Sequence, residues 1–170
     1  HVHHSRTNHM DEGETHVPHK ANTPAGEKFI KLRDSIGEDA FALYTIFLML
    51  VFGWPVYLLT GATGGPARGF TSHFIIPNKL FPNKMLPKLI LSIVGIFGMF
   101  YLLYLWAQAT SFATVFALYF GPYFIGNMWL VGYTYLQHTE IDIPHYDATS
   151  WNWLEGALCT IDRNYPPFIN

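Results

Sequence analysis

The sequence predicts an all-α integral-membrane protein, with two or three hydrophobic helices joined to polar cytosolic segments. Half of its 170 residues are hydrophobic and only 13% are charged, against about 25% in a typical soluble domain. No residue from Phe41 to Ala67, and none from Leu89 to Thr139, carries a formal charge. A helix needs about 20 apolar residues to cross a bilayer, so these stretches have room for three helices. Backbone groups in lipid must be paired within the segment, which favours helices.

Composition divides the chain into a polar segment rich in histidine, a first membrane helix, a loop with many prolines, a hydrophobic hairpin and a polar tail. The corresponding ranges are 1–40, 41–62, 63–87, 88–107 with 111–137, and 139–170. In the first helix, Trp54 and Tyr57 are typical of a membrane interface, and Pro55 can kink the helix. Gly121-Pro122 and Gly126 predict a bend or close helix contacts in the last stretch.

Charge and cysteine content exclude several classes of function. A net charge of -2 gives no support for binding nucleic acid or any strongly charged partner. The single cysteine, Cys159, excludes an intrachain disulfide framework and a cysteine-based zinc site. The first residue is not methionine, and we expect the chain to be part of a longer protein.

The densest candidate site is the run His1-Val2-His3-His4. If this run is helical, His1 and His4 share a face, because residues three apart are neighbours on a helix. Neutral imidazoles suit iron, zinc, copper or nickel, and a chain with one cysteine disfavours iron–sulfur chemistry. The alternatives are a solvated polar terminus and a purification tag, although the valine and the following Ser-Arg-Thr-Asn are unlike a tag.

Each of the other histidines can also be interpreted as a structural or solvent-facing residue. His138 lies where the last hydrophobic stretch meets the polar tail, so it is either a metal ligand or a ring in the membrane interface. His145 is in a loop, and Asp162-Arg163 is expected to form a local ion pair. Four more are expected to face solvent: His9, His16, His19 and His73.

Short motifs occur in the same order as in a known family along nearly the whole chain. They are HHS at 3–5, GWPVYL at 53–58, TYLQHT at 134–139, PHYD at 144–147 and TIDR at 160–163. This set resembles the membrane fatty-acid desaturases of the methyl-end type, which include the Δ12 (ω-6) and ω-3 acyl-lipid desaturases. The resemblance implies a partial desaturase domain between the second and third histidine boxes, with the leading histidine of the second box just before His1 and the third box after Asn170.

The resemblance implies an O2-dependent enzyme that inserts a cis double bond into a lipid-linked acyl chain. It implies two non-haem iron ions, with His3, His4 and His138 among their ligands, and electrons from cytochrome b5 or ferredoxin. Gln137 and Thr139 beside His138 favour the Δ12 type. The expected location is the endoplasmic reticulum membrane, with several crossings, and a plastid membrane is the alternative. The chain alone is expected to be inactive, because most ligands would lie outside it.

Other functions stay open from the residues alone. An ω-3 desaturase, or a related acyl hydroxylase, acetylenase or epoxygenase, would use the same scaffold. A zinc-binding membrane transporter or a non-catalytic membrane scaffold would be of another class. If two histidine boxes meet one iron pair, the chain between them crosses the bilayer an even number of times. We therefore expect 41–62 and 111–137 to cross and 88–107 to stay at one side, which puts His73 on the side opposite to His4.

Overall fold

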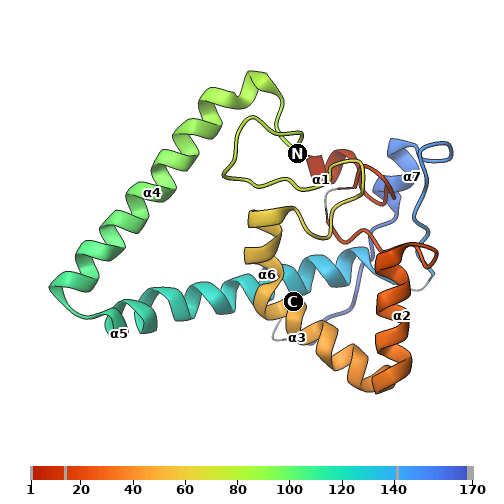
Figure 1. The fold of residues 1–170 in the computed structure, drawn as a ribbon, viewed down its shortest axis with the longest axis horizontal. Helices are drawn as coiled ribbons and strands as arrows, with labels where there is room; N and C mark the ends of the chain where they lie inside the picture. The colour runs from red at the N-terminus through yellow and green to blue at the C-terminus, as the bar shows by residue number, and fades with distance from the viewer. Residues whose placement is uncertain (1, 14, 141, 168–170) are drawn as a thin grey trace.

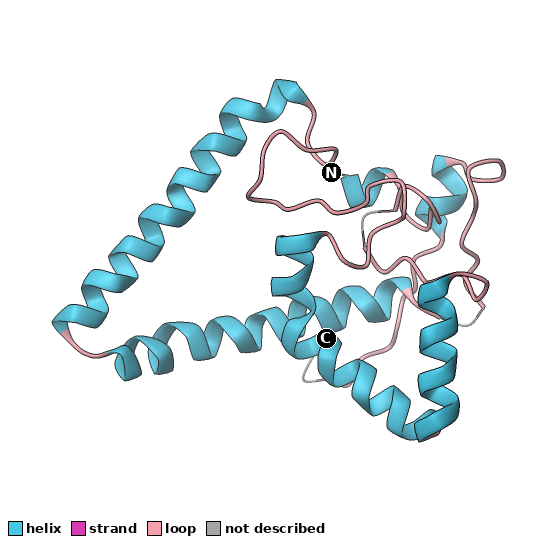
Figure 2. Ribbon diagram, in the orientation of Figure 1, coloured by secondary structure: helices cyan, strands magenta, loops and turns pink. Residues whose placement is uncertain are grey.

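The computed structural model describes residues 2–13, 15–140 and 142–167, so His1 lies outside the described residues. The helical elements are α1 (Val2–Ser5), α2 (Pro24–Ile36), α3 (Glu38–Thr60), η1 (Asn83–Met85), α4 (Leu86–Ala109), α5 (Phe112–Val115), η2 (Phe116–Phe120), α6 (Gly121–His138) and α7 (Trp153–Leu158). Across these ranges the chain forms helices and loops without a strand (Figures 1 and 2). The predicted all-α class is confirmed.

Three helices are long and apolar enough to cross a membrane, namely Glu38–Thr60, Asn83–Ala109 and Phe112–His138. The first begins earlier than the predicted 41–62, because Glu38 and Asp39 place negative charge at its first turn, where free backbone N–H groups favour it. It ends at Gly61, whose φ of 68° is the left-handed conformation that glycine adopts readily.

The hairpin consists of α4, a short turn and the continuous run α5–η2–α6. The segment η2 is a π-helix, in which the N–H of Gly121 donates to Phe116 O, five residues back. Pro122 follows directly and has no N–H to donate, so a widened turn at this point fits the local sequence. The sequence predicts a bend or close helix contacts in this stretch. At Gly126 no close contact is made, since a Cβ built there would meet nothing within 4 Å, and the π segment lies directly before Gly121-Pro122.

The helices α3 and α6 pack against each other where they cross, and α2 packs against the start of α3 (Figure 1). The helix α2 begins with Pro24, and the Thr23 hydroxyl caps it by accepting from Gly26 N at 3.2 Å. In Figure 1, α2 runs across the direction of α5–η2–α6 rather than along it.

The loop after α3 folds back onto the polar N-terminal segment. Three backbone hydrogen bonds of 2.7–3.0 Å join residues 63–67 to residues 11–17. The Arg68 guanidinium adds two bonds to Glu12 O, of 2.7 and 3.0 Å. The end of α3 therefore lies on the same side as the N-terminal histidines. The expectation that His73 lies away from His4 is wrong, because both residues line one cavity.

Candidate functional site

The structure brings together the three predicted metal ligands. His3 and His4 lie on α1, and His138 is the last residue of α6. His3 Nε2 and His138 Nε2 are 3.0 Å apart, although the two residues are separated by 135 positions. The ring centroid of His3 is 4.6 Å from that of His138 and 5.5 Å from that of His4.

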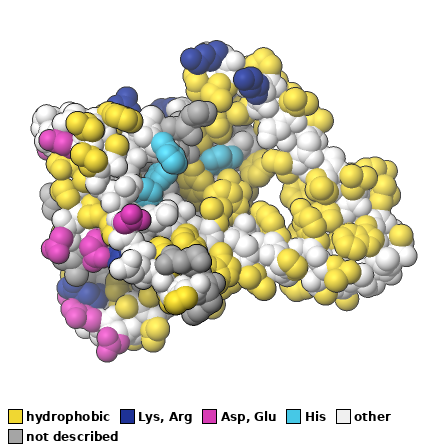
Figure 3. All heavy atoms as spheres, turned by 180° about the vertical axis from the view of Figure 1, so that it is seen from behind, with side chains coloured by type: hydrophobic (Ala, Val, Ile, Leu, Met, Phe, Trp, Pro, Cys, Tyr) yellow, Lys and Arg dark blue, Asp and Glu magenta, His cyan; other side chains and the backbone are white. Residues whose placement is uncertain are grey.

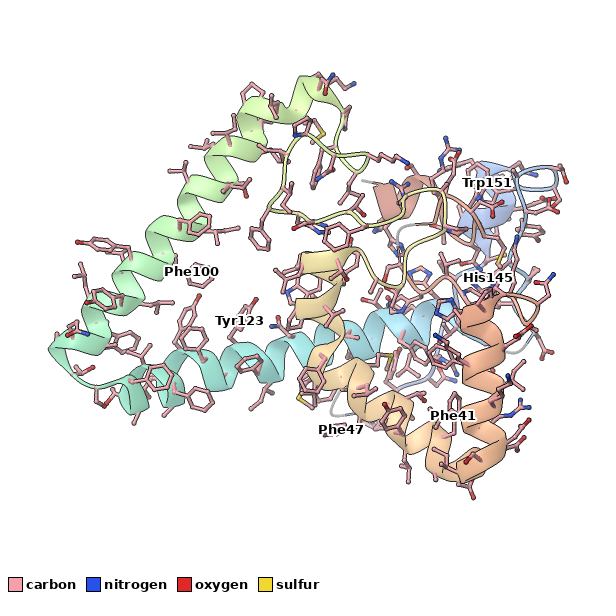
Figure 4. The ribbon with its side chains drawn as sticks, viewed as in Figure 1. Phe41, Phe47, Phe100, Tyr123, His145 and Trp151 are labelled. Atoms are coloured by element: carbon pink, nitrogen blue, oxygen red, sulfur yellow. The ribbon has the colours of Figure 1, made fainter. Side chains whose placement is uncertain are left out.

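A set of contacts between residues 7–12 and 144–156 holds α1 beside the end of α6. Tyr146 N donates to Asn8 O and Met10 N donates to Tyr146 O, both at 2.9 Å, which forms an isolated parallel bridge at His9. The indole Nε1 of Trp151 donates to Thr7 O at 2.9 Å. In Figure 4, His145 lies near the histidine-bearing end of α6, and Trp151 lies near α7. We call these contacts the clasp.

A turn built on Asp147, the last residue of the PHYD motif, shapes the chain that enters the clasp. The Thr149 and Ser150 hydroxyls donate to one carboxylate oxygen of Asp147, at 2.7 and 2.9 Å, and their backbone N–H groups donate to the same oxygen. These bonds lower the pKa of Asp147 to about 2. The carboxylate is thus charged at ordinary pH and acts as a local cap of the loop.

His9 belongs to this structural framework, and the expectation that it faces solvent is wrong. Its side chain is only 4% exposed. Its Nδ1 accepts two backbone N–H groups, those of Asp11 and Glu12, each at 3.1 Å. Its ring lies 5.2 Å from the Trp151 ring. These contacts assign His9 to folding rather than to chemistry.

We expect His9→Ala to lower the free energy of unfolding by about 1–3 kcal/mol, because it leaves two backbone donors without their acceptor. Thermal unfolding of the full-length protein in detergent measures this. His19→Ala is the matched control, since the His19 side chain is exposed and its ring contacts the ring of Phe29. Equal stability of both variants would contradict the structural role of His9.

Arg163 stabilises the end of α6, but through partners other than the neighbouring acid. Its guanidinium donates to Leu136 O at 2.9 Å and to Thr139 O at 3.3 Å, and it pairs with Glu140 at 2.6 Å. The local ion pair expected with Asp162 is replaced by this arrangement. Basic side chains near a helix C-terminus satisfy its last carbonyls, and here they fix the turn that carries His138.

A cavity of about 1080 Å³ adjoins the histidines. One wall comes from one face of α3 and from the last turns of α6, with Ile46, Met49, Leu58, Leu130 and Val131 among its apolar residues. The rest of the wall carries six imidazoles, those of His3, His4, His16, His19, His73 and His145. In Figure 3, histidine side chains lie beside a recess whose visible wall is hydrophobic. The space combines an apolar interior with nitrogen donors.

His16 and His73 are half-buried in this wall, so the expectation that they face solvent is wrong for both. Burial lowers the pKa of His16 to about 4, with further lowering by His138 and His3. Burial also lowers the pKa of His145. The lowered pKa keeps the His16 ring neutral at ordinary pH, and neutral imidazole is the form that binds metals. His16 also has a φ of 57°, an uncommon value for a residue other than glycine.

No group of three His, Cys, Asp or Glu side chains within the described ranges converges closely enough to hold a metal ion. The His3–His138 pair is within hydrogen-bond distance, and the same separation fits part of such a site. Two nitrogens bound to one ion at about 2.0–2.1 Å, at angles near 90–110°, lie about 3 Å apart, and the observed separation is 3.0 Å. His138 Nδ1 is buried and has no hydrogen-bond partner among the described residues. The pair can supply two ligands, and further ligands would have to complete the site.

Sequence reasoning selected His3, His4 and His138 but missed His16, His73 and His145 as parts of one cavity wall. The missed residues lie in loops, where periodicity carries no information about neighbours. The loops that carry His16 and His73 are brought together by backbone hydrogen bonds between residues 63–67 and residues 11–17.

No family model and no solved structure matches the chain. Curated relatives do match it. The chain is 36% identical to a Delta(12)-fatty-acid desaturase of Arabidopsis thaliana, 38% identical to a Delta(12) acyl-lipid conjugase (11E,13E-forming) of Impatiens balsamina, and 36% identical to an omega-6 fatty acid desaturase, endoplasmic reticulum isozyme 1, of Glycine max. Each match covers 96% of this chain and 41% of the relative, so the chain spans about two fifths of the length of these proteins.

The matches extend over nearly all of the chain. They confirm the resemblance seen in the ordered motifs. The chain belongs to the membrane fatty-acid desaturase family, in the methyl-end group that contains the Δ12 enzymes.

Proposed function

We propose that this chain forms the part of an O2-dependent acyl-lipid desaturase in which His3, His4 and His138 bind iron beside a cavity for the acyl chain. The observation that carries the proposal is the His3–His138 pair, with nitrogens 3.0 Å apart, next to an apolar cavity of about 1080 Å³. An acyl chain requires an apolar cavity and an iron ion requires nitrogen ligands. The reaction requires the two to be adjacent.

The reaction removes one hydrogen atom from each of two adjacent methylenes. O2 takes up these two hydrogen atoms together with two electrons and two protons, and becomes two waters. Bound iron would supply the oxidising power for this step, which no side chain has. The chain's own residues contribute position. The apolar faces of α3 and α6 would hold the acyl chain away from water, while the clasp keeps His3 against His138. The electrons would come from cytochrome b5 or ferredoxin.

The distribution of basic residues supports a cytosolic position for the site. Lys79, Lys84 and Lys88 precede or begin α4, and residues 103–116 around the hairpin turn carry no charge. The start of α4 lies near the N-terminal segment, and the hairpin turn is at the far end (Figure 1). Basic residues favour the cytosolic side. We infer that α4 and α5–η2–α6 are the two crossings, with α3 beginning and ending on the histidine side.

The Glycine max relative is named for the endoplasmic reticulum, which supports that membrane as the location. Most of the first matches are named as Delta(12) or omega-6 desaturases, which supports Δ12 specificity over ω-3. The Impatiens balsamina relative is a conjugase, and its 38% identity makes conjugated-bond formation a second candidate on the same scaffold.

A zinc transporter is less well supported by the hairpin. Transport would require polar residues along a path through the membrane helices. Among the described residues of the hairpin helices, Asn127 is the one buried polar side chain. The polar groups gather instead at one end, around the cavity.

Expression of the full-length protein in a host that makes monounsaturated but not polyunsaturated acyl lipids tests the proposed activity. We expect a new diene with its second double bond at Δ12, identified by mass spectrometry of lipid extracts. Conjugated products would favour the second candidate. Absence of any new acyl product from protein that is present in the membrane and contains iron would contradict both.

A further inference from the structure

The contact between α3 and α6 forms a narrow place in the cavity. Gly53 is the one glycine of α3, and it lines the cavity together with Met49, one helical turn earlier. A Cβ built on Gly53 would lie 3.3 Å from Val131 Cγ1 and 3.8 Å from Met49 Cγ. Val131 lines the same cavity from α6. Gly53 and Met49 of α3 therefore meet Val131 of α6 in the cavity wall, at a point where Gly53 has no side chain.

On α6, this contact lies in the part of the cavity wall that is farthest along the helix from His138. The wall residues on that helix are Leu130, Val131, Thr134 and Tyr135. Val131 precedes His138 by seven residues, which corresponds to about 10 Å of helix at 1.5 Å per residue. An acyl chain that passes the histidine pair and extends along α6 would therefore reach Gly53 and Val131 at its far end.

Resting on the proposed function, we infer that Gly53, Met49 and Val131 determine which acyl chains the cavity accepts, by setting how far a chain extends beyond His3 and His138. The absence of a side chain at Gly53 lets α3 and α6 approach closely, and a methyl group there would press on Val131 Cγ1 at 3.3 Å. One methylene more or less in a hydrophobic pocket changes discrimination between substrates by about tenfold or more. A change of one methyl group at this floor would shift the preferred chain length.

Packing between α3 and α6 offers a simpler role for Gly53. Both roles predict a loss of total activity when the contact is disturbed, so total activity does not separate them. Only a role in specificity predicts opposite shifts when the floor is filled and when it is deepened. Gly53→Ala fills the floor, and Val131→Ala and Met49→Ala deepen it.

The test uses the full-length protein in host membranes, supplied with a mixture of saturated and monounsaturated acyl chains that differ by two carbons. Product ratios are measured by mass spectrometry, with wild type and Gly126→Ala as controls. Gly126 is a suitable control because it lies on α6 and an added Cβ meets nothing within 4 Å.

We expect Gly53→Ala to shift the product ratio toward shorter chains by about tenfold, and Val131→Ala and Met49→Ala to shift it toward longer chains. If the Gly53→Ala protein does not accumulate in the membrane, the product ratios of Val131→Ala and Met49→Ala still test the inference. Unchanged ratios in variants that still turn over would overturn this inference and leave the proposed function intact. Wild type without any acyl product would instead refute the proposed function.

Discussion

Replacing His138 with alanine is expected to lower acyl-chain turnover by the full-length protein by at least about 100-fold. Loss of groups that merely orient a metal ligand costs about 10–100-fold, and loss of the ligand itself should exceed this. His138 is the residue to change because its Nε2 lies 3.0 Å from His3 Nε2 and its Nδ1 is buried without a hydrogen-bond partner in the described structure.

Turnover is measured as product formed per unit of protein in the membrane, which corrects for expression. His19→Ala is the matched control, because His19 lines the cavity, is exposed and is not one of the proposed iron ligands. We expect its turnover to stay within about threefold of wild type, since the substitution removes an exposed side chain and no proposed ligand. If both variants lose turnover equally, the special role of His138 is refuted.

Gly156→Ala is expected to destabilise the clasp. Gly156 lies in α7 and is buried against the N-terminal segment. A Cβ there would lie 2.5 Å from Thr7 O and 2.7 Å from Trp151 Nε1, the two atoms that share a hydrogen bond. A backbone carbonyl cannot move aside as a flexible side chain can. We expect the free energy of unfolding to fall by about 1–3 kcal/mol, the usual cost of overpacking.

Thermal unfolding in detergent measures this change, and iron content of the purified protein measures its effect on the site. Gly95→Ala on α4 is the matched control, because it is also inside a helix but its added Cβ meets nothing within 4 Å. Alanine has the higher helix propensity, so Gly95→Ala should be neutral or stabilising by up to about 1 kcal/mol. Equal stability of the two variants would show that the clasp tolerates the extra carbon.

The helices of this protein could be predicted from sequence because their signal is local. Two long stretches without charge predict apolar helices wherever they lie, and the short polar break at 108–111 predicts a hairpin. The arrangement of α3 could not be predicted in this way. Its length and composition are those of a crossing helix, and the position of its end beside the N-terminal segment depends on backbone bonds between residues 63–67 and 11–17, which no side-chain pattern reveals.

The candidate site was predictable in part for a similar reason. His3, His4 and His138 lie in motifs of a known family, so resemblance selected them. His9 and His16 lie in a loop with two left-handed residues, Asn8 and His16 itself. Such a loop turns sharply, so periodicity does not indicate which side chains are buried. Their burial is visible only in the folded chain.

The central claim is that His3 and His138 bind one metal ion beside the acyl cavity. X-ray absorption at the iron edge, on the purified full-length protein, tests it most directly when wild type is compared with His138→Ala. We expect bound iron with imidazole scattering at about 2 Å in wild type, and fewer imidazole ligands or less iron in the variant. Wild type that binds no iron, or a variant with the same iron content and the same spectrum, would contradict it.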